Sequence, residues 1–169
     1  MTKVLETERL VLRHIEADDA AFILELLNEP GWLRFIGDRG VRTLQGARDY
    51  IRNGPAAMIE RHGFGLFLVE LKADGTPLGM CGLIKRDGLS DVDIGFAFLE
   101  RHGRKGYALE SASAVMDHAR AVLGLSRVVA ITSVDNHASI RLLEKIGLRF
   151  VRMVTLPGND EEIRLFATA

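Results

Sequence analysis

The sequence predicts a mixed α/β fold, on three observations. Short apolar or alternating segments that are typical of strands are interrupted by segments with the spacing of amphipathic helices. Three successive strands, ending with 92–99, are followed by a helix and a further strand, an order that places a parallel pair at the centre of a mixed sheet. The composition, 47% hydrophobic and 27% charged, is that of a globular chain able to bury a core.

The N-terminal part is expected to form a strand, two helices and a loop. Residues 5–15 alternate through apolar and charged side chains, as a half-buried strand does. The acidic pair that begins at Asp18 favours the first turn of a helix. Residues 28–43 show no clear period and are predicted to be a loop. Thr43 is a candidate cap for a second helix that runs to about residue 61, with a kink at its Gly-Pro pair.

The rest of the chain is expected to add six strands and two helices. In chain order these are strands 65–71, 78–85 and 92–99, a helix at 106–123, a strand at 127–133, a helix at 138–146, and strands 150–156 and 162–168. Gly124 and Gly147 follow the two helices and are expected to end them. The prediction is therefore a seven-stranded sheet flanked by about four helices, in a single domain over residues 1–169.

Charge and cysteine content exclude several classes of protein. The 22 basic and 23 acidic residues leave a net charge of −1, which does not suit a nucleic-acid-coating or polybasic membrane-bound protein. A single cysteine, Cys81, rules out an internal disulfide and favours a reducing compartment. No secretory signal and no stretch near the ~18 apolar residues of a membrane span are evident. We therefore expect a cytoplasmic protein with no nucleic-acid or membrane partner.

Residues 103–108, Gly-Arg-Lys-Gly-Tyr-Ala, are a candidate anion site because they follow a strand and open a helix. Gly106 allows close approach of the backbone, and the first N–H groups of a helix point outward with a partial positive charge. Arg104 and Lys105 add local cations, so the segment could hold a diphosphate. The alternative is an ordinary turn between a strand and a helix. Other phosphate motifs and metal-ligand motifs are absent, and we expect no metal.

Two motifs at this spacing resemble the GNAT N-acetyltransferases: RKGYALE at 104–110 and SVDNHASIRLLEKIGL at 133–148. The opening TERLVLR, at 7–13, resembles the branch that includes the RimJ/RimL-type ribosomal-protein N-terminal acetyltransferases. The resemblance implies acetyl-CoA as co-substrate, direct attack by a primary amine, and splayed parallel strands that hold the pantetheine arm. In the family's Gln/Arg-x-x-Gly-x-Gly/Ala pattern the first position is Gly103 here. This departure leaves backbone amides as the expected diphosphate contacts.

The resemblance also implies which residues bind the cofactor. They are Phe98, Leu99, Arg104, Lys105, Gly106, Tyr107, Ala108 and Asn136. Backbone N–H groups near Phe98, where the strands diverge, are expected to meet the oxyanion of the tetrahedral intermediate.

Asp93 is the first candidate for a general base. Strand alternation places it on the same face as Gly95 and Ala97, whose small side chains leave room for a substrate. The alternative is a carboxylate that faces water or pairs with an arginine. Less specific rivals are Glu100, His102 and Glu162.

Ser139 stands where some members of the family protonate, or hydrogen-bond to, the departing sulfur. The alternative is that Ser139 is only the third residue of a helix capped by Asn136. Trp32 and Phe35 are expected to shape the acceptor site, although they could equally anchor a loop to the core.

The expected function is acetyl-CoA-dependent transfer of acetyl to a primary amine. A protein N-terminal α-amine is favoured by the branch resemblance alone, and polyamines or aminoglycosides are the small-molecule alternatives. A noncatalytic acyl-CoA-binding module stays open because Gly103 departs from the pattern and no base is unambiguous. A flavodoxin-like phosphate-ligand protein is a third alternative, and a homodimer is left open.

Overall fold

The computed structural model describes residues 2–169 and confirms the mixed α/β fold. Its sheet has eight strands in the order β1-β2-β3-β4-β5-β6-β8-β7. Their bounds are β1 Lys3–Glu6, β2 Leu10–Arg13, β3 Leu66–Leu71, β4 Pro77–Ile84, β5 Asp93–Phe98, β6 Val129–Thr132, β7 Arg149–Val154 and β8 Ile163–Ala167. Neighbouring strands are antiparallel except β5 and β6, which form the parallel pair expected at the centre.

The sheet has eight strands rather than seven because residues 5–15 do not form one strand. The chain turns back after β1, where the Thr7 N–H donates to the Leu10 carbonyl at 2.9 Å, and β2 then pairs antiparallel with β1. The prediction of a single strand was wrong at this turn. Residues 6–9, Glu-Thr-Glu-Arg, contain no Gly, Pro, Asn or Asp that would mark a turn, so the sequence pattern does not show that the direction changes.

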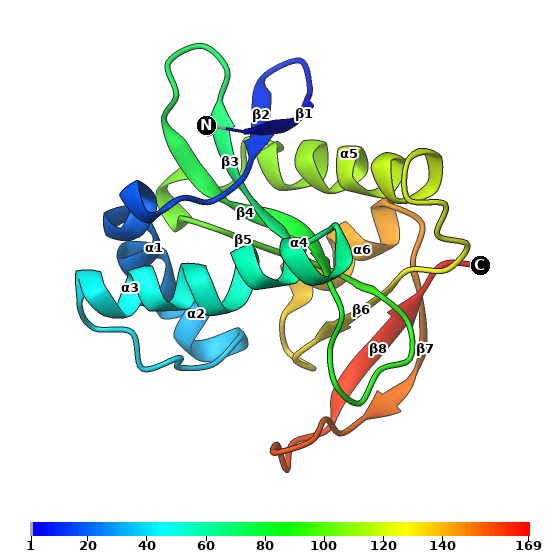
Figure 1. Cartoon of the computed structure of the whole chain (residues 1–169). Helices are drawn as coiled ribbons and strands as arrows, with labels where there is room; N and C mark the ends of the chain where they lie inside the picture. The colour runs from blue at the N-terminus through cyan, green and yellow to red at the C-terminus, as the bar shows by residue number, and fades with distance from the viewer. Residues whose placement is uncertain (1) are drawn as a thin grey trace.

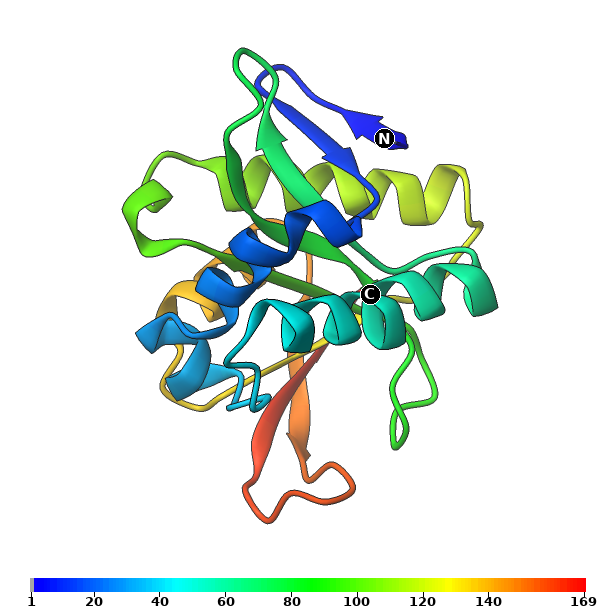
Figure 2. The same cartoon turned by 60° about the vertical axis from the view of Figure 1, so that its left-hand side comes forward.

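Helices cover both faces of the sheet (Figures 1 and 2). Their bounds are α1 Ala20–Leu27, α2 Pro30–Phe35, α3 Leu44–Ile51, α4 Ala57–His62, α5 Tyr107–Ala121 and α6 His137–Lys145. The first four lie on one face, and α5 and α6 lie on the other. Because α2 falls within 28–43, the prediction of a loop there was wrong. Pro30 occupies the first position of α2, where its fixed φ and missing N–H favour a helix start.

The predicted cap of α3 and the predicted end of α6 are confirmed. The Thr43 Oγ1 accepts from the Gly46 N–H at 2.9 Å and caps α3. The helix then continues through a π-helical segment that contains Pro55 into α4, so the expected kink is a widened turn. At the end of α6 the Leu148 N–H donates to the Leu143 carbonyl at 3.0 Å, which is the bond of a Schellman end.

Alternating side chains of the central strands bury one apolar cluster on each face. Phe67, Cys81 and Ile94 pack with residues of α5 and α6, whereas Leu68 and Met80 pack with residues of α1 and α3. The Cys81 thiol is fully buried, and burial raises its pKa to about 12. The two clusters therefore pack against opposite faces of β4 and β5. Within residues 2–169 no helix combines the length and apolarity needed to cross a bilayer.

Candidate active site

The parallel strands β5 and β6 are joined at one end only. Their ladder contains a single residue pair, Asp93 with Val129, and the Val129 N–H donates to the Val92 carbonyl at 2.9 Å. Beyond that pair, the two strands continue to Phe98 and Thr132 without pairing. The sheet therefore opens between β5 and β6, as the family resemblance implied.

Within residues 2–169, the edge of β5 that faces this gap pairs with no strand beyond Asp93. The Leu99 N–H donates to the Leu78 carbonyl at 3.0 Å, and successive residues of an antiparallel ladder direct their N–H groups to opposite sides. The N–H groups of Phe96 and Phe98 therefore point away from β4, into the gap. Such donors suit a carbonyl oxygen that gains negative charge during a reaction.

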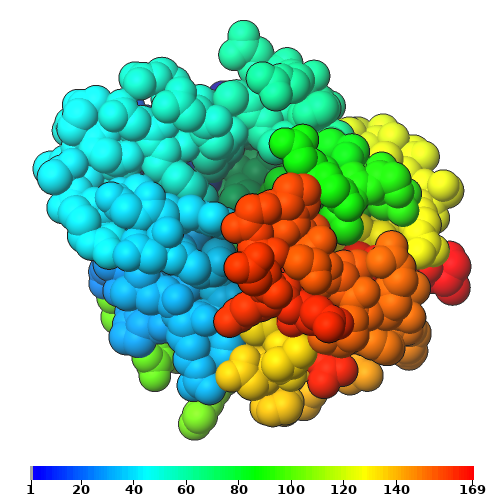
Figure 3. All heavy atoms as spheres, turned by 90° about the horizontal axis from the view of Figure 1, so that it is seen from below, coloured from blue at the N-terminus to red at the C-terminus, as the bar shows by residue number. Residues whose placement is uncertain are grey.

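A pocket of about 800 Å³ occupies the gap and reaches both faces of the sheet. On one face its wall includes Trp32, Tyr50 and Met58, and on the other it includes Asn136 and Ser139. Seen from below, the surface is hollowed beside the segment that carries α3, drawn in cyan (Figure 3). The volume lies within the range of roughly 300–1,000 Å³ that small-molecule sites occupy.

Asp93 lies at the closed end of the gap, on the pocket wall, and is 1% exposed. The Arg86 Nε donates to its Oδ2 at 2.8 Å, and its Oδ1 has no hydrogen-bond partner within residues 2–169. Burial raises the pKa of Asp93, although the Arg86 guanidinium opposes the shift. Asp93 thus pairs with an arginine and does not face bulk water, and it still offers one carboxylate oxygen as a proton acceptor.

The other candidate bases are less suitable than Asp93, because each is either solvated or outside the pocket wall. Glu100 lines the pocket but is exposed, so its carboxylate is solvated. His102 does not line the pocket, and burial lowers the pKa of its imidazole. Glu162 is exposed in the segment between β7 and β8 and also lies outside the pocket wall.

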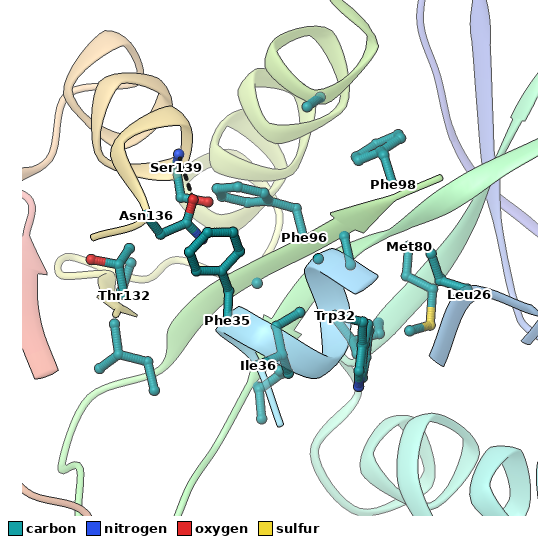
Figure 4. A pocket seen from close by; sticks show the side chains of 18 of the residues that line it. Leu26, Trp32, Phe35, Ile36, Met80, Phe96, Phe98, Thr132, Asn136 and Ser139 are labelled. Atoms are coloured by element: carbon teal, nitrogen blue, oxygen red, sulfur yellow. Dashed lines mark hydrogen bonds between the residues drawn. The ribbon is translucent and has the colours of Figure 1, made fainter. Parts of the chain in front are cut away.

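Ser139 and Asn136 lie at the start of α6 (Figure 4). The Asn136 Oδ1 accepts from the Ser139 backbone N–H at 3.4 Å. Asn136 therefore caps α6, which was one of the two roles expected for it. That bond leaves the Ser139 hydroxyl free of the cap, and both residues line the pocket. The rings of Phe35 and Phe96 point toward Asn136 in the same view.

The helix α2 forms part of the pocket wall on the face of the sheet opposite α6. Trp32 is 6% exposed and packs in the apolar cluster with residues of α1, as a residue that anchors this segment to the core does, and its side chain also lines the pocket. Half-buried Phe35 lines the pocket, and its carbonyl accepts from the Ser133 hydroxyl at 2.9 Å. Arg34 pairs with Asp135 at 3.1 Å. These two contacts connect α2 to the loop before α6.

The turn into α5 adjoins the pocket. Gly106 has φ +82° and Arg104 has φ +62°, and Arg104 is the one non-glycine residue with positive φ in the described part of the chain. The first backbone bond of α5 runs from the Glu110 N–H to the Gly106 carbonyl at 3.0 Å. The four preceding N–H groups, 106–109, therefore have no acceptor inside the helix. Ala108 lines the pocket, and residues 103–106 are exposed beside it.

The structure therefore brings most of the predicted site residues together. The pocket wall contains Trp32, Phe35, Asp93, Phe98, Ala108, Asn136 and Ser139. Arg104, Lys105, Gly106 and Tyr107 are not in the wall and lie at the adjoining start of α5. Leu99 is fully buried, away from the wall, and its N–H is bonded to β4.

Sequence reasoning missed Arg86, the partner of Asp93, which lies in the wall just after β4. It lies outside every predicted strand and helix, so no periodic pattern marks it. Tyr50 and Met58 were also missed, because their helical spacing predicts only that they face the sheet. Within residues 2–169, no group of three or more His, Cys, Asp or Glu residues could hold a metal.

Comparison with known proteins identifies the family. The model of the acetyltransferase (GNAT) domain matches residues 9–149. The chain belongs to the GNAT acetyltransferase family. It is therefore an acyltransferase of the N-acetyltransferase type, and the resemblance stated from its two motifs is confirmed.

This GNAT protein is similar in sequence to other N-acetyltransferases of the family, and its fold matches those of solved acetyltransferases. It is 31% identical over 151 residues to the uncharacterized N-acetyltransferase YoaA of Bacillus subtilis (strain 168), which covers 88% of this chain and 84% of YoaA. Its fold matches the RimL ribosomal L7/L12 alpha-N-protein acetyltransferase in complex with coenzyme A, with a TM-score of 0.81 and 17% identity. The match covers 98% of this chain and 96% of the RimL chain. It also matches a chimera of the spermidine N-acetyltransferase SpeG from Vibrio cholerae and hSSAT, with TM-score 0.75, 18% identity and coverage of 94% of each chain.

Proposed function

We propose that this GNAT protein binds acetyl-CoA with its pantetheine arm between β5 and β6 and transfers the acetyl group to a primary amine. The observation that carries the proposal is the single-pair ladder between these strands, with the N–H groups of Phe96 and Phe98 directed into a pocket of about 800 Å³. Because the pocket reaches both faces of the sheet, a thioester from the α5 face and an amine from the α2 face can meet in the gap.

The start of α5 is the proposed site of the diphosphate. Its four N–H groups at 106–109 have no helical acceptor and carry the positive end of the helix dipole. Since Gly103 replaces the family's Gln or Arg, the contacts come from the backbone, with the exposed side chains of Arg104 and Lys105 as nearby cations. Phe98, Ala108 and Asn136, in the pocket wall, are the proposed contacts of the arm.

The proposed reaction is direct attack of the amine nitrogen on the thioester carbonyl carbon. The amine must be neutral to attack, which an α-amine of pKa ~8 achieves near neutral pH more readily than a lysine of pKa ~10.4. Asp93 accepts the proton that the nitrogen loses, directly or through one water. The N–H groups of Phe96 and Phe98 stabilise the oxyanion, and Ser139 donates a proton or a hydrogen bond to the sulfur as the C–S bond breaks.

A protein N-terminal α-amine is the acceptor that we propose first. The opening TERLVLR motif and the fold shared with RimL support it. A small-molecule amine such as a polyamine is the second candidate, supported by the fold shared with the spermidine N-acetyltransferase chimera. Trp32 and Phe35, on the α2 side of the pocket, are the proposed acceptor contacts in either case.

A two-step experiment tests the proposal. Acetyl-CoA is expected to raise the Tm of the protein, whereas FMN and ATP at the same concentration are not. Thiol release from acetyl-CoA is then followed with N-terminal peptides, polyamines and aminoglycosides, and at least one class is expected to be acetylated. Absence of a Tm shift with acetyl-CoA would reject the cofactor, and absence of thiol release across the panel would reject the transfer.

Ser139→Ala is expected to lower kcat by about tenfold and leave the Kd of acetyl-CoA unchanged, because a thiol of pKa ~8.5 already leaves fairly well. The substitution keeps the helix cap, which uses the backbone N–H of residue 139. Asn136→Ala is the comparison, since it removes the cap and should lower the Tm. An unaltered kcat in Ser139→Ala would assign this serine to the helix start alone.

A further inference from the structure

The guanidinium of Arg9 connects the turn between β1 and β2 to the start of α5. Its Nε donates to the Glu110 Oε1 at 2.7 Å, and its Nη1 donates to the Lys105 carbonyl at 2.9 Å. Its Cζ lies 4.6 Å from the centroid of the Tyr107 ring. One side chain therefore contacts the loop before α5 and the first turn of the helix at the same time.

Glu110 is held by the same turn. Its Oε2 accepts from the Thr7 hydroxyl and, at 3.0 Å, from the Arg9 backbone N–H. Burial opposes ionisation of Glu110, but these bonds together with the guanidinium lower its pKa. Figures 1 and 2 both show the β1–β2 hairpin beside α5. The carboxylate thus fixes the guanidinium in one orientation.

The bond to the Lys105 carbonyl sets the direction of the next N–H group. The peptide bonds of the described residues are all trans, and in a planar trans peptide the carbonyl and the N–H point in opposite directions. Since the Lys105 carbonyl points toward Arg9, the N–H of Gly106 points away from Arg9. That N–H is the first of the four free groups at the start of α5.

The loop needs such a contact because its backbone is strained. Arg104 has φ +62°, a conformation that is unfavourable for any residue with a Cβ and persists only where the surroundings impose it. Gly106 also leaves space for Arg9, because a Cβ at residue 106 would lie 3.2 Å from the Arg9 Nη2. The sequence of the loop and the position of Arg9 are therefore adapted to each other.

We propose that Arg9 is a positioning residue for acetyl-CoA, one that holds residues 103–106 in the conformation that presents the Gly106 N–H to the diphosphate. This inference rests on the proposed function. Arg9 acts through the loop, because its contacts are with Lys105, Tyr107 and Glu110. Its effect is therefore confined to ligands that carry a diphosphate.

The test compares acetyl-CoA with acetyl-pantetheine, a thioester that lacks the nucleotide and the diphosphate. Arg9→Ala is expected to raise the Kd and KM of acetyl-CoA about tenfold, the effect of losing one charge-assisted contact. It is expected to leave kcat, and kcat/KM for acetyl-pantetheine, within about twofold of wild type. Arg9→Lys is expected to recover part of the affinity. An ammonium can donate to either the Glu110 carboxylate or the Lys105 carbonyl, but it lacks the planar guanidinium that donates to both.

Arg127→Ala is the matched control, since Arg127 pairs with Asp91 at 3.2 Å and its side chain is 45% exposed, close to the 44% of Arg9. Arg127→Ala should leave the Kd of acetyl-CoA and the kcat/KM for both thioesters unchanged. Equal Kd values of acetyl-CoA for wild type and Arg9→Ala would overturn the proposal, as would an equal loss with acetyl-pantetheine. If Arg9→Ala does not fold, Arg9→Lys and Arg9→Gln make the same comparison. Failure of the wild-type protein itself to bind acetyl-CoA would instead reject the proposed function.

Discussion

Gly106→Val is expected to weaken acetyl-CoA binding about 100-fold while the protein stays folded. Residue 106 has φ +82°, which a β-branched side chain adopts at a high cost, and its Cβ would lie 3.2 Å from the Arg9 Nη2. Relaxing the loop would turn the free N–H groups away from the diphosphate. Losing two charge-assisted hydrogen bonds of about 1.5 kcal/mol each gives roughly this factor.

Gly124→Val separates this effect from general strain. Gly124 has φ +65° just after the other end of α5, and a Cβ there would have no atom within 4 Å. Both variants should lower the Tm by a similar amount, but only the change at residue 106 should alter the Kd measured by calorimetry. Wild-type affinity in Gly106→Val would show that the diphosphate does not lie at this turn.

Asp93→Asn is expected to lower kcat by about 10²- to 10⁴-fold, the usual contribution of a positioned general base. The amide has the same shape as the carboxylate and can still accept from the Arg86 Nε, but it cannot take a proton from the amine. The Kd of acetyl-CoA should stay unchanged because Asp93 is at the first residue of β5, whereas the start of α5 follows the last residue of that strand. Asp91→Asn, two residues earlier at an exposed ion pair, is the control that should retain full activity.

The pH profile gives a second measurement of the same prediction. Burial raises the pKa of Asp93 above its usual range, so the carboxylate becomes protonated as the pH falls through that raised value and can no longer act as a base. Activity should therefore fall on the acidic side, and Asp93→Asn should lack this limb. If Asp93→Asn keeps both the wild-type kcat and the acidic limb of the pH profile, the general base is another group.

The elements that could be predicted from the sequence are those with local signals. The end of α6 follows from a glycine and an apolar residue at fixed offsets, and the bonds of Leu148 confirm it. The start of α3 follows from Thr43. In contrast, α2 was missed because Pro30 was interpreted as the stop of the preceding helix, whereas it is the first residue of α2. The turn after β1 was missed because residues 6–9 contain none of the residues that mark a turn.

The candidate site could be predicted in its residues but not in its contacts. Asp93, Ser139 and Asn136 lie in one wall because β5 and α6 flank the gap. The bond between Arg86 and Asp93 depends on how a turn folds over the sheet, and the bond between Arg9 and Lys105 joins segments 96 positions apart. Neither bond produces a periodic pattern in the sequence, so neither can be predicted without the tertiary structure.

The burial of Cys81 determines what a disulfide dye such as Ellman's reagent would report. The side chain is 0% exposed and its thiol has a pKa of about 12, so the reactive thiolate is absent at the mildly alkaline pH where the dye is used. In the native protein, all of the yellow colour should come from coenzyme A released by turnover. On addition of denaturant, one further equivalent should appear per chain, so the same cuvette would report both catalysis and loss of the native state.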